Sequence, residues 1–495
     1  MTRPNSRRKK IERALPPSGD AASQPPRPGL NKPAPEDEPA AGPPEGAAPE
    51  ADAGEQGSSL GMAFRLWASA YRVELLVFGA AFLVLASFSS QRFLRQSEAP
   101  HFVYQAKAWL DGRMDLDPRT LPNLEDWACV REVEGRKVRC EGPIRATDRW
   151  YVSFPAFPSA VMLPFVAVNG YQLNDTSLTV IAAALALAAF YSLLRMLSDS
   201  GESTRQVQDN VLLTAILGFG TLFFYCAIRG EVWFTAEVMG VAFTCWYVRN
   251  SVGVRRPLLA GLFYSMAVLT RTPLLFTGIF FVMEAVCPGP GDRLAQLRAL
   301  RQQWREPLRK LAWFAAGAAP LALTAAVLNV TRFGSPAEFG HRFLYNNRVN
   351  ADIDRFGLFS LEYLPRNLKA ALLTFPSIQW SPFRLEYSPH GLSLLLTLPV
   401  LILVLMPKEK RRLQWPLWAA VALCALPGFA YQNTGYMQFG FRFSLDWTPY
   451  IILLLALSGW SLKERLSSLL VAVGFLVNFW GAVAFRGYTE LVRRW

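Results

Sequence analysis

The sequence predicts an all-α polytopic membrane protein with about eleven transmembrane helices, additional interfacial helices and a long first extracytoplasmic loop. Hydrophobic residues make up 52% of the 495 residues and charged residues only 18%, whereas soluble domains carry about 25%. The apolar residues also gather in blocks of roughly 17–22 residues, the length of a helix that crosses a bilayer. These blocks recur from Val73 to Phe485, and buried core helices of a soluble protein do not explain so long a series.

Residues 1 to about 60 are predicted to be a disordered cytoplasmic tail. They are rich in Pro, Ala, Gly and Glu and lack aromatic residues, so they cannot bury enough apolar surface to offset the entropy of ordering. No apolar core directly follows the basic residues 7–13, which excludes a signal peptide. Residues 61–495 are predicted to form the transmembrane domain.

The formal net charge of +13 reflects the distribution of basic residues in a membrane protein. The basic residues lie in short loops between apolar blocks, as the positive-inside rule predicts, and they do not form one soluble basic module. We therefore expect the lipid bilayer, here a bacterial inner membrane, as a partner and no nucleic acid.

The orientation follows from the same charges. Arg65 and Arg72 precede the first span, so its start is predicted to be cytoplasmic and the C-terminus of the chain to lie outside. The predicted spans are approximately 73–90, 175–195, 208–228, 231–248, 257–271, 274–287, 311–330, 390–406, 414–431, 445–460 and 466–485.

The apolar segment 158–168 is too short to cross a bilayer alone. If it does not cross, every later basic cluster falls on the inner side; if it crosses, all of them lie outside. We therefore interpret it as an interfacial or re-entrant helix, with a tilted span extending past Gly170 as the alternative. The outer loops are then 91–157, 331–389 and 432–443.

Two of the six cysteines lie in a polar loop. Cys129 and Cys140 have no CxxC pattern or neighbouring His that would indicate a metal site. Since the first outer loop faces an oxidising compartment in this topology, a disulfide between them is predicted. The other four cysteines sit in or beside apolar blocks, where free Cys is an ordinary small hydrophobe.

Glu98 is the first candidate for chemistry, because it lies about one helical turn beyond the first span. A carboxylate there can act as a general base toward an acceptor hydroxyl, although a solvated loop acid is the commoner case. The same loop ends in the aromatic and proline run 148–158, which contains Arg149 and Tyr151. That run fits either an aromatic belt at the membrane interface or a platform on which sugar rings stack.

Further charged residues lie at the outer ends of predicted spans. Glu237 falls inside an apolar block, where an ionisable residue indicates function by default, although pairing with an arginine would make it structural. Arg271 could pair with an acid or bind phosphate. Arg442 is expected at the depth of lipid phosphates, which guanidinium groups bind bidentately; contact with lipid headgroups is the alternative. No P-loop, HExxH motif or serine nucleophile elbow is present.

Short motifs resemble those of the glycosyltransferase C superfamily, membrane enzymes that use polyprenyl-phosphate sugars. The first-loop acidic motif reads Ser-Glu-Ala-Pro-His-Phe at residues 97–102, which implies Glu98 as the base and His101 at the substrate. The segment 151–158 resembles the family's Tyr-x-x-Lys-x-Pro element. An acidic residue near the fourth span corresponds to Glu231 or Glu237, and Gly440–Phe443 matches a Gly-x-Arg-Phe motif that contains Arg442.

Two positions depart from the family pattern. The first acid of its pair is Ser97 here, so Glu98 would act alone, and the Lys before the prolines is absent, with Arg149 as a substitute.

The resemblance covers about residues 70–460. It implies transfer of a sugar from a polyprenyl-phosphate donor to a hydroxyl of a lipid, glycan or protein at the outer membrane face, with Arg271 and Arg442 on the donor phosphate. The cofactor is unknown: no metal ligand set is evident, a divalent metal is possible, and no nucleotide is expected. A flippase or transporter of lipid-linked sugars and a non-catalytic scaffold for envelope assembly remain alternatives.

Overall fold

The computed structural model describes residues 69–122, 126–287, 289, 295–296, 298, 302–345, 347–381 and 383–492. The predicted disordered tail lies outside these residues. The described part of the chain is mostly helical, as the sequence predicts, and belongs to one unit that begins at Ala63.

Four helices among the described residues are long and apolar enough to cross a membrane by length and composition. They match four of the predicted spans, and this is consistent with a membrane protein. These helices are α2 (Arg72–Ser89), which continues as the 3₁₀ turn η1 (Ser90–Leu94), α5 (Asp175–Asp199), α12 (Arg305–Phe333) and α19 (Arg465–Val492).

The remaining helices of the bundle are shorter, and several predicted spans are broken in two. The predicted span 208–228 consists of two helices separated at Gly220, and the predicted span 390–406 is interrupted around Pro399. Helices of this length do not by themselves establish the predicted number of spans. In chain order the elements are α6 (Val207–Phe219), α7 (Phe223–Ala227), α8 (Val232–Ser251), η3 (Val252–Val254), α9 (Pro257–Val268), η4 (Thr272–Thr277), α10 (Gly278–Val286), α15 (Leu394–Thr397), α16 (Leu401–Leu405), α17 (Gln414–Ala430), η7 (Arg442–Asp446) and α18 (Thr448–Ala456).

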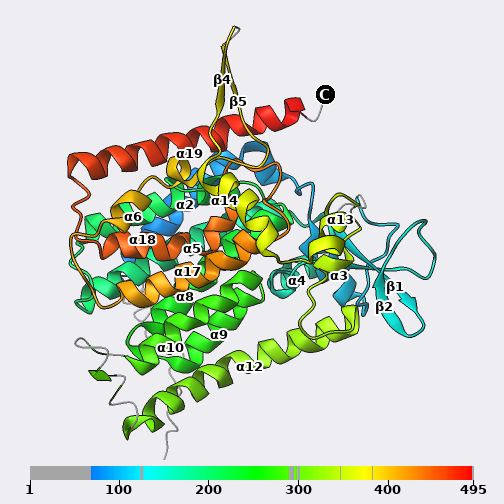
Figure 1. Cartoon of the computed structure of the whole chain (residues 1–495), viewed down its shortest axis with the longest axis horizontal. Coiled ribbons are helices and arrows are strands. Elements are labelled where there is room, and N and C mark those ends of the chain that lie inside the picture. The colour runs from blue at the N-terminus through cyan, green and yellow to red at the C-terminus, as the bar shows by residue number, and fades with distance from the viewer. Residues whose placement is uncertain are drawn as a thin grey trace, which may run out of the picture. The chain divides into compact units, whose positions relative to one another are not determined.

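The bundle is built around buried helices. Helices α5 and α8 lie in its middle, and every residue of α18 is buried. Figure 1 shows α19 along one edge of the bundle and α12 along the other, so these two helices enclose the shorter ones. Only 6% of the apolar stretch of α12 is buried, and its other residues are exposed or half-buried, as expected for a helix that faces lipid on most sides.

The predicted first outer loop carries a small sheet. Strands β1 (Trp127–Val133), β2 (Arg136–Arg139) and β3 (Arg149–Val152) form an antiparallel sheet in the order β2-β1-β3. A disulfide joins Cys129 on β1 to Cys140 directly after β2, with 5.4 Å between their Cα atoms. In Figure 1 this sheet lies at one end of the bundle, beside α3 (His101–Leu110).

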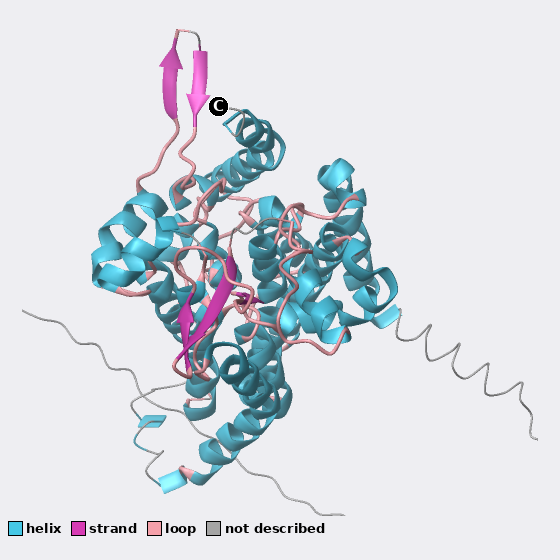
Figure 2. Ribbon diagram, turned by 90° about the vertical axis from the view of Figure 1, so that its right-hand side faces the viewer, coloured by secondary structure: helices cyan, strands magenta, loops and turns pink. Residues whose placement is uncertain are grey.

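The predicted second outer loop, 331–389, holds a second group of short elements. They are η5 (His341–Phe343), α13 (Asn347–Phe356), η6 (Leu361–Tyr363), α14 (Leu364–Leu372), β4 (Ser377–Trp380) and β5 (Phe383–Glu386). Strands β4 and β5 pair with each other alone, and Figures 1 and 2 show this hairpin standing away from the helices.

The segment predicted to be interfacial forms α4 (Phe157–Asn169). A helix of this length measures about 20 Å, less than the roughly 30 Å of a hydrocarbon core. It ends at Asn169, because Gly170 adopts a φ of 58°, and η2 (Gly170–Gln172) follows. The helix therefore does not extend past Gly170, and its apolar residues pack against α3.

Helices α9 and α12 approach each other closely at two glycines. A Cβ atom added to Gly261 would lie 1.9 Å from the carbonyl oxygen of Phe314, and one added to Gly317 would lie 2.0 Å from that of Leu258. Both obstacles are backbone atoms, so only the absence of a side chain permits this contact. Small residues at helix interfaces allow such close packing in membranes.

We predict that Gly261→Ala destabilises the contact between α9 and α12 by about 1–3 kcal/mol, the usual cost of overpacking. The melting temperature of the purified protein in detergent should fall. Gly79→Ala is the matched control, because no atom lies within 4 Å of the added Cβ on α2. Equal melting temperatures for the two variants would contradict the prediction.

Candidate functional site

One cavity of about 1310 Å³ opens among the segments predicted to lie outside the membrane. Its walls come from the loop after α2, the junction of α7 and α8, the turn η4, the segment after α12, the end of α17 and the turn η7. Of the residues proposed from the sequence, five line this cavity: Glu98, His101, Glu231, Arg271 and Arg442. The structure therefore brings together residues that are more than 300 positions apart in the chain.

Glu98 is exposed at the cavity wall, and the residues on both sides of it are fixed. The backbone N–H and hydroxyl of Ser97 donate to the two carboxylate oxygens of Asp175 at 2.8 and 2.6 Å. The backbone N–H of Val232 donates to the carbonyl of Ala99 at 3.0 Å. Asp175 begins α5 and Val232 begins α8, so two core helices hold the short loop that presents Glu98.

Arg229, Arg92 and Glu231 form a charged group next to Glu98. Arg229 contacts Glu231 at 2.8 and 3.3 Å, and Arg92 contacts it at 3.3 Å. Burial opposes the charge of Arg229, but Glu231 and, more weakly, Glu98 raise the pKa of its guanidinium. Nη1 of Arg229 is buried and has no hydrogen-bond acceptor among the described residues, which leaves it as a donor for a ligand.

A second charged group forms another part of the wall. Arg271 donates to both oxygens of Asp446 at 2.9 and 2.7 Å. Arg442 lies 3.3 Å from Glu237 and donates from Nη1 to Gln438 at 3.1 Å. Glu237 is buried and is not part of the cavity lining; it also lies 4.0 Å from Arg271. Its position matches the structural alternative, in which it pairs with arginines.

All three histidines of the chain line the cavity, together with aromatic rings. The His101 ring stacks on Trp127 with 3.8 Å between ring centroids. Phe154 packs edge-on against both His101 and His341, at 6.0 and 5.6 Å. His101 and Trp127 are buried, but the half-buried Phe154 and the exposed Tyr436 line the cavity. Such rings next to charged groups suit a ligand that combines apolar faces with polar substituents.

Besides Glu237, two binding residues proposed from the sequence do not line the cavity, namely Arg149 and Tyr151. Residues 149–152 form strand β3, in which alternate side chains share a face. Arg149 is largely exposed and pairs with Asp115 at 2.8 Å, and the Tyr151 ring packs against Phe333 at the end of α12, 5.6 Å away. The sequence predicts an aromatic belt or a sugar-stacking platform in this run and no strand, so it does not reveal that both residues are held away from the cavity.

An ion pair lies beside the disulfide of the three-stranded sheet. Arg131 donates to both oxygens of Asp148 at 2.7 and 2.8 Å, which lowers the pKa of Asp148 against the opposing effect of burial. Asp148 lies close to the sulfurs of Cys129 and Cys140. Because those sulfurs are bonded to each other and the carboxylate is held by Arg131, this group is not a metal site.

Several charged or titratable residues of the cavity or its supports were not proposed from the sequence, among them Arg92, Asp175, Arg229, His341 and Asp446. Asp175 is the first residue of α5 and Asp446 lies two residues before α18 begins, and an acidic residue near the N-terminal end of a helix is favourable for local reasons. Nothing in the local sequence indicates that their partners are Ser97 and Arg271. Only a knowledge of which helix ends meet could have identified them.

The sequence was compared with models of known protein families and with curated proteins, and it matches none of them. The candidate function therefore rests on the cavity itself and on the short motifs that its residues occupy.

Because of His341, the stability of the folded protein is expected to depend on pH. Burial and, more weakly, the charge of Arg271 lower the pKa of His341 to about 4, whereas an unfolded chain has a histidine pKa of about 6.5. The unfolded state therefore binds more protons between these values. The contribution of neutral His341 to stability is complete above about pH 6.5 and is lost as the pH falls toward about 4.

We predict that His341→Gln removes this part of the pH dependence. Between pH 7 and pH 5 the melting temperature of the wild type should fall further than that of the variant, measured in the same detergent and salt. Parallel curves for the two proteins would show that His341 does not carry the effect.

Proposed function

We propose that this protein transfers a sugar from a polyprenyl-phosphate donor to an acceptor hydroxyl at the outer face of a bacterial inner membrane. The observation that carries the proposal is the shared cavity: an exposed carboxylate, several guanidinium groups and aromatic surfaces line the same space. A base, a phosphate-binding group and a sugar-stacking surface are the three parts that this reaction needs. The motif resemblance adds the choice of donor.

In the proposed mechanism Glu98 accepts the proton of the acceptor hydroxyl. The hydroxyl oxygen then forms a bond to the anomeric carbon while the bond from that carbon to the phosphate oxygen breaks, and the polyprenyl phosphate leaves with the electron pair. The leaving group gains negative charge, which nearby guanidinium groups stabilise. The donor is already activated, so no nucleotide is needed.

The arginines make different contacts, and we propose different parts for them. Asp446 binds both Nε and Nη2 of Arg271, so we assign Arg271 to the cavity wall. Nη1 of Arg442 donates to Gln438 and its Nε forms an ion pair with Glu237, whereas its Nη2 donates no hydrogen bond to any residue that the structure describes. Arg442 and Arg229 therefore have N–H groups that can meet the donor phosphate.

The proposed topology has eleven spans, with the N-terminus in the cytoplasm. Its support is that the predicted outer loops meet around the cavity, while the predicted inner basic loops near residues 205, 410 and 463 meet elsewhere. The broken and short helices are counted as spans because their neighbours shield their ends from lipid.

A flippase for lipid-linked sugars is the second candidate. It would also use the arginines to bind phosphate, but it would not need a general base. A substitution at Glu98 that spares donor binding therefore separates the two functions.

We predict that Glu98→Gln lowers transfer about 10²–10⁴-fold, the usual contribution of a general base, with donor binding retained. Cells that carry the variant should accumulate the polyprenyl-linked sugar, measured by mass spectrometry of lipid extracts. Glu362→Gln is the control, because Glu362 is exposed on the same side and is not part of the cavity lining. Wild-type transfer by Glu98→Gln would exclude Glu98 as the base.

Arg442→Lys should affect donor binding more than the chemical step, the reverse of what we expect for Glu98→Gln. The substitution keeps the positive charge near Glu237 but removes the guanidinium fork, so we expect weaker donor binding and a smaller effect on the chemical step. Binding is measured as donor lipid retained on the purified protein. Unchanged retention would remove Arg442 from the donor site.

The topology is tested with Glu362→Cys and Lys410→Cys. Both positions are exposed, three of the native free cysteines are buried and Cys287 is partly buried. In intact cells a membrane-impermeant maleimide should label Glu362→Cys, and it should label Lys410→Cys only after permeabilisation. Equal labelling of the two variants in intact cells would overturn the proposed orientation.

A further inference from the structure

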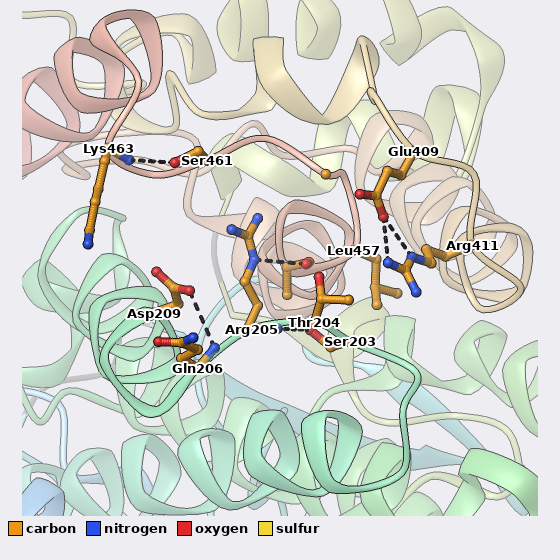
Figure 3. Close-up of a pocket in the computed structure, with 12 residues that line it drawn as sticks. Ser203, Thr204, Arg205, Gln206, Asp209, Glu409, Arg411, Leu457, Ser461 and Lys463 are labelled. Carbon is orange, nitrogen blue, oxygen red and sulfur yellow. Dashed lines mark hydrogen bonds and ion pairs between the residues drawn. The ribbon is translucent and has the colours of Figure 1, made fainter.

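A second pocket, of about 340 Å³, lies where three loops predicted to face the cytoplasm meet. The loops are residues 203–206 before α6, residues 409–411 before α17 and residues 456–463 between α18 and α19. Each loop contributes a basic side chain: Arg205, Arg411 or Lys463. Figure 3 shows Arg205 between Lys463 and Asp209 on one side and the Glu409–Arg411 pair on the other.

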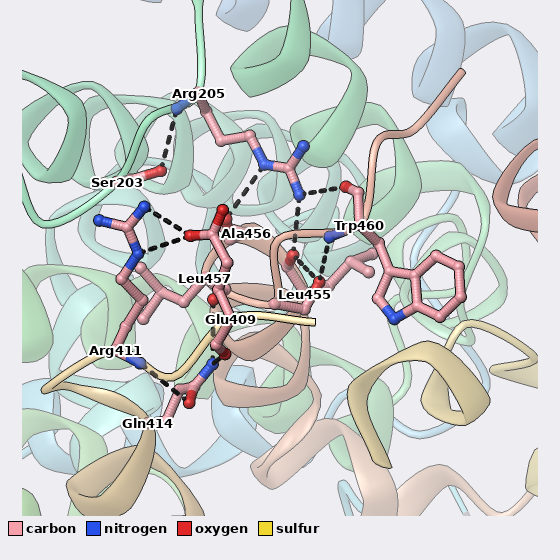
Figure 4. Close-up of polar contacts among 10 residues, drawn as sticks. Ser203, Arg205, Glu409, Arg411, Gln414, Leu455, Ala456, Leu457 and Trp460 are labelled. Atoms are coloured by element: carbon pink, nitrogen blue, oxygen red, sulfur yellow. Dashed lines mark hydrogen bonds and ion pairs between the residues drawn. The ribbon is translucent and has the colours of Figure 1, made fainter. Parts of the chain in front are cut away.

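The guanidinium of Arg205 is held rigidly by backbone carbonyls. Its Nε donates to Ala456 at 3.0 Å, and its Nη2 donates to Leu455 at 3.1 Å and to Trp460 at 2.7 Å (Figure 4). Nη1 of Arg205 makes no hydrogen bond to any residue that the structure describes. The pocket therefore contains a fixed positive charge with free N–H groups, and a group that is already ordered loses little entropy when a ligand binds.

Other donors surround this guanidinium. The Lys463 side chain is exposed and forms no ion pair with the described residues. The hydroxyl oxygen of Ser203 accepts the backbone N–H of Arg205 at 3.2 Å, and that of Ser461 accepts the backbone N–H of Lys463 at 3.3 Å. Because both hydroxyls act as acceptors in these bonds, each keeps its own hydrogen for a ligand.

The two acidic residues of the pocket do not cancel its charge. Arg411 donates to Glu409 at 2.9 and 2.6 Å and neutralises it. Asp209 accepts the backbone N–H of Gln206 in the capping box of α6. Three cationic and two anionic side chains line the pocket, which leaves one net positive charge.

We propose that this pocket binds a phosphate group at the cytoplasmic face. A fixed guanidinium, a flexible ammonium, two hydroxyl donors and the N-terminal end of α6 together match the tetrahedral oxygens of phosphate. The phosphate can belong to the headgroup of an anionic phospholipid or to a soluble phosphate ester. The site is separate from the outer cavity, because it is lined by Glu409 and Arg411, which precede α17, whereas the outer cavity is lined by residues from Cys424 onward in the C-terminal half of that helix.

The test uses the full-length protein in a neutral detergent, with inorganic phosphate titrated against chloride at constant ionic strength. The melting temperature should rise with phosphate and reach saturation, because a ligand that binds only the folded state stabilises it by mass action. Lys463→Gln should raise the dissociation constant for phosphate about fivefold, the upper range for the loss of one exposed ion pair. Asp209→Asn should lower the dissociation constant for phosphate, because the substitution removes a negative charge while the amide oxygen still accepts the capping hydrogen bond.

Lys410→Gln is the matched control. It removes the same charge from an exposed lysine that lies in the 409–411 loop but is not part of the pocket lining, so its phosphate response should equal that of the wild type. A rise in melting temperature that is identical in all four proteins would show that phosphate acts as a general salt and does not bind at this pocket, and it would overturn the proposal. The absence of any response to phosphate in the wild type would overturn it as well.

A second arm distinguishes the two sources of phosphate. The wild type and Lys463→Gln are reconstituted in nanodiscs of phosphatidylcholine, with or without phosphatidic acid. If phosphatidic acid stabilises the wild type more than the variant and abolishes the response to inorganic phosphate, the ligand is a lipid headgroup. If inorganic phosphate stabilises the wild type equally in both kinds of nanodisc, the ligand is a soluble phosphate compound.

Discussion

The ion pair between Arg271 and Asp446 is the contact on which the outer cavity depends. Arg271 follows α9 and Asp446 precedes α18, 175 residues later, and two hydrogen bonds hold these helix ends together. Charges in a poorly hydrated wall are stable only when each one has a partner in good geometry. Glu237 supplies the second counter-charge, because it lies 3.3 Å from Arg442 and 4.0 Å from Arg271. Two carboxylates therefore face two guanidinium groups in this part of the molecule.

The sequence predicts well those features that depend on composition and on single positions. The apolar blocks identify the four long helices. A charge at the end of an apolar block draws attention to Glu98, Arg271 and Arg442, and all three line the outer cavity. Hydropathy does not detect a break at Gly220 within an apolar block, since both halves are equally apolar, and this is why the predicted span 208–228 is two helices. Pairs such as Ser97 with Asp175, 78 residues apart, depend on which helix ends meet, and no local pattern encodes that.

Helix α18 shows how burial dictates the contacts at the other side of the molecule. All nine of its residues are buried, so water cannot satisfy the carbonyl groups at its C-terminal end, and another donor must. Arg205 supplies it by binding Leu455 and Ala456, and a cation at this end also complements the helix dipole. Arg271 acts at the opposite end through Asp446. One short helix is thus fastened at both ends by guanidinium groups, one belonging to the outer cavity and one to the inner pocket.

The position of Glu98 follows from a similar requirement. The acidic pair of the motif that this loop resembles has Ser97 in its first position, and the carboxylate that binds Ser97 comes from Asp175 on α5. A second acid at position 97 would face Asp175 at hydrogen-bond distance, and two carboxylates so close together repel each other unless one is protonated. Serine avoids that repulsion and adds a hydroxyl donor. Asp175 can therefore accept two hydrogen bonds from one residue, and this fixes the backbone immediately before Glu98 while the Glu98 carboxylate stays exposed to the cavity.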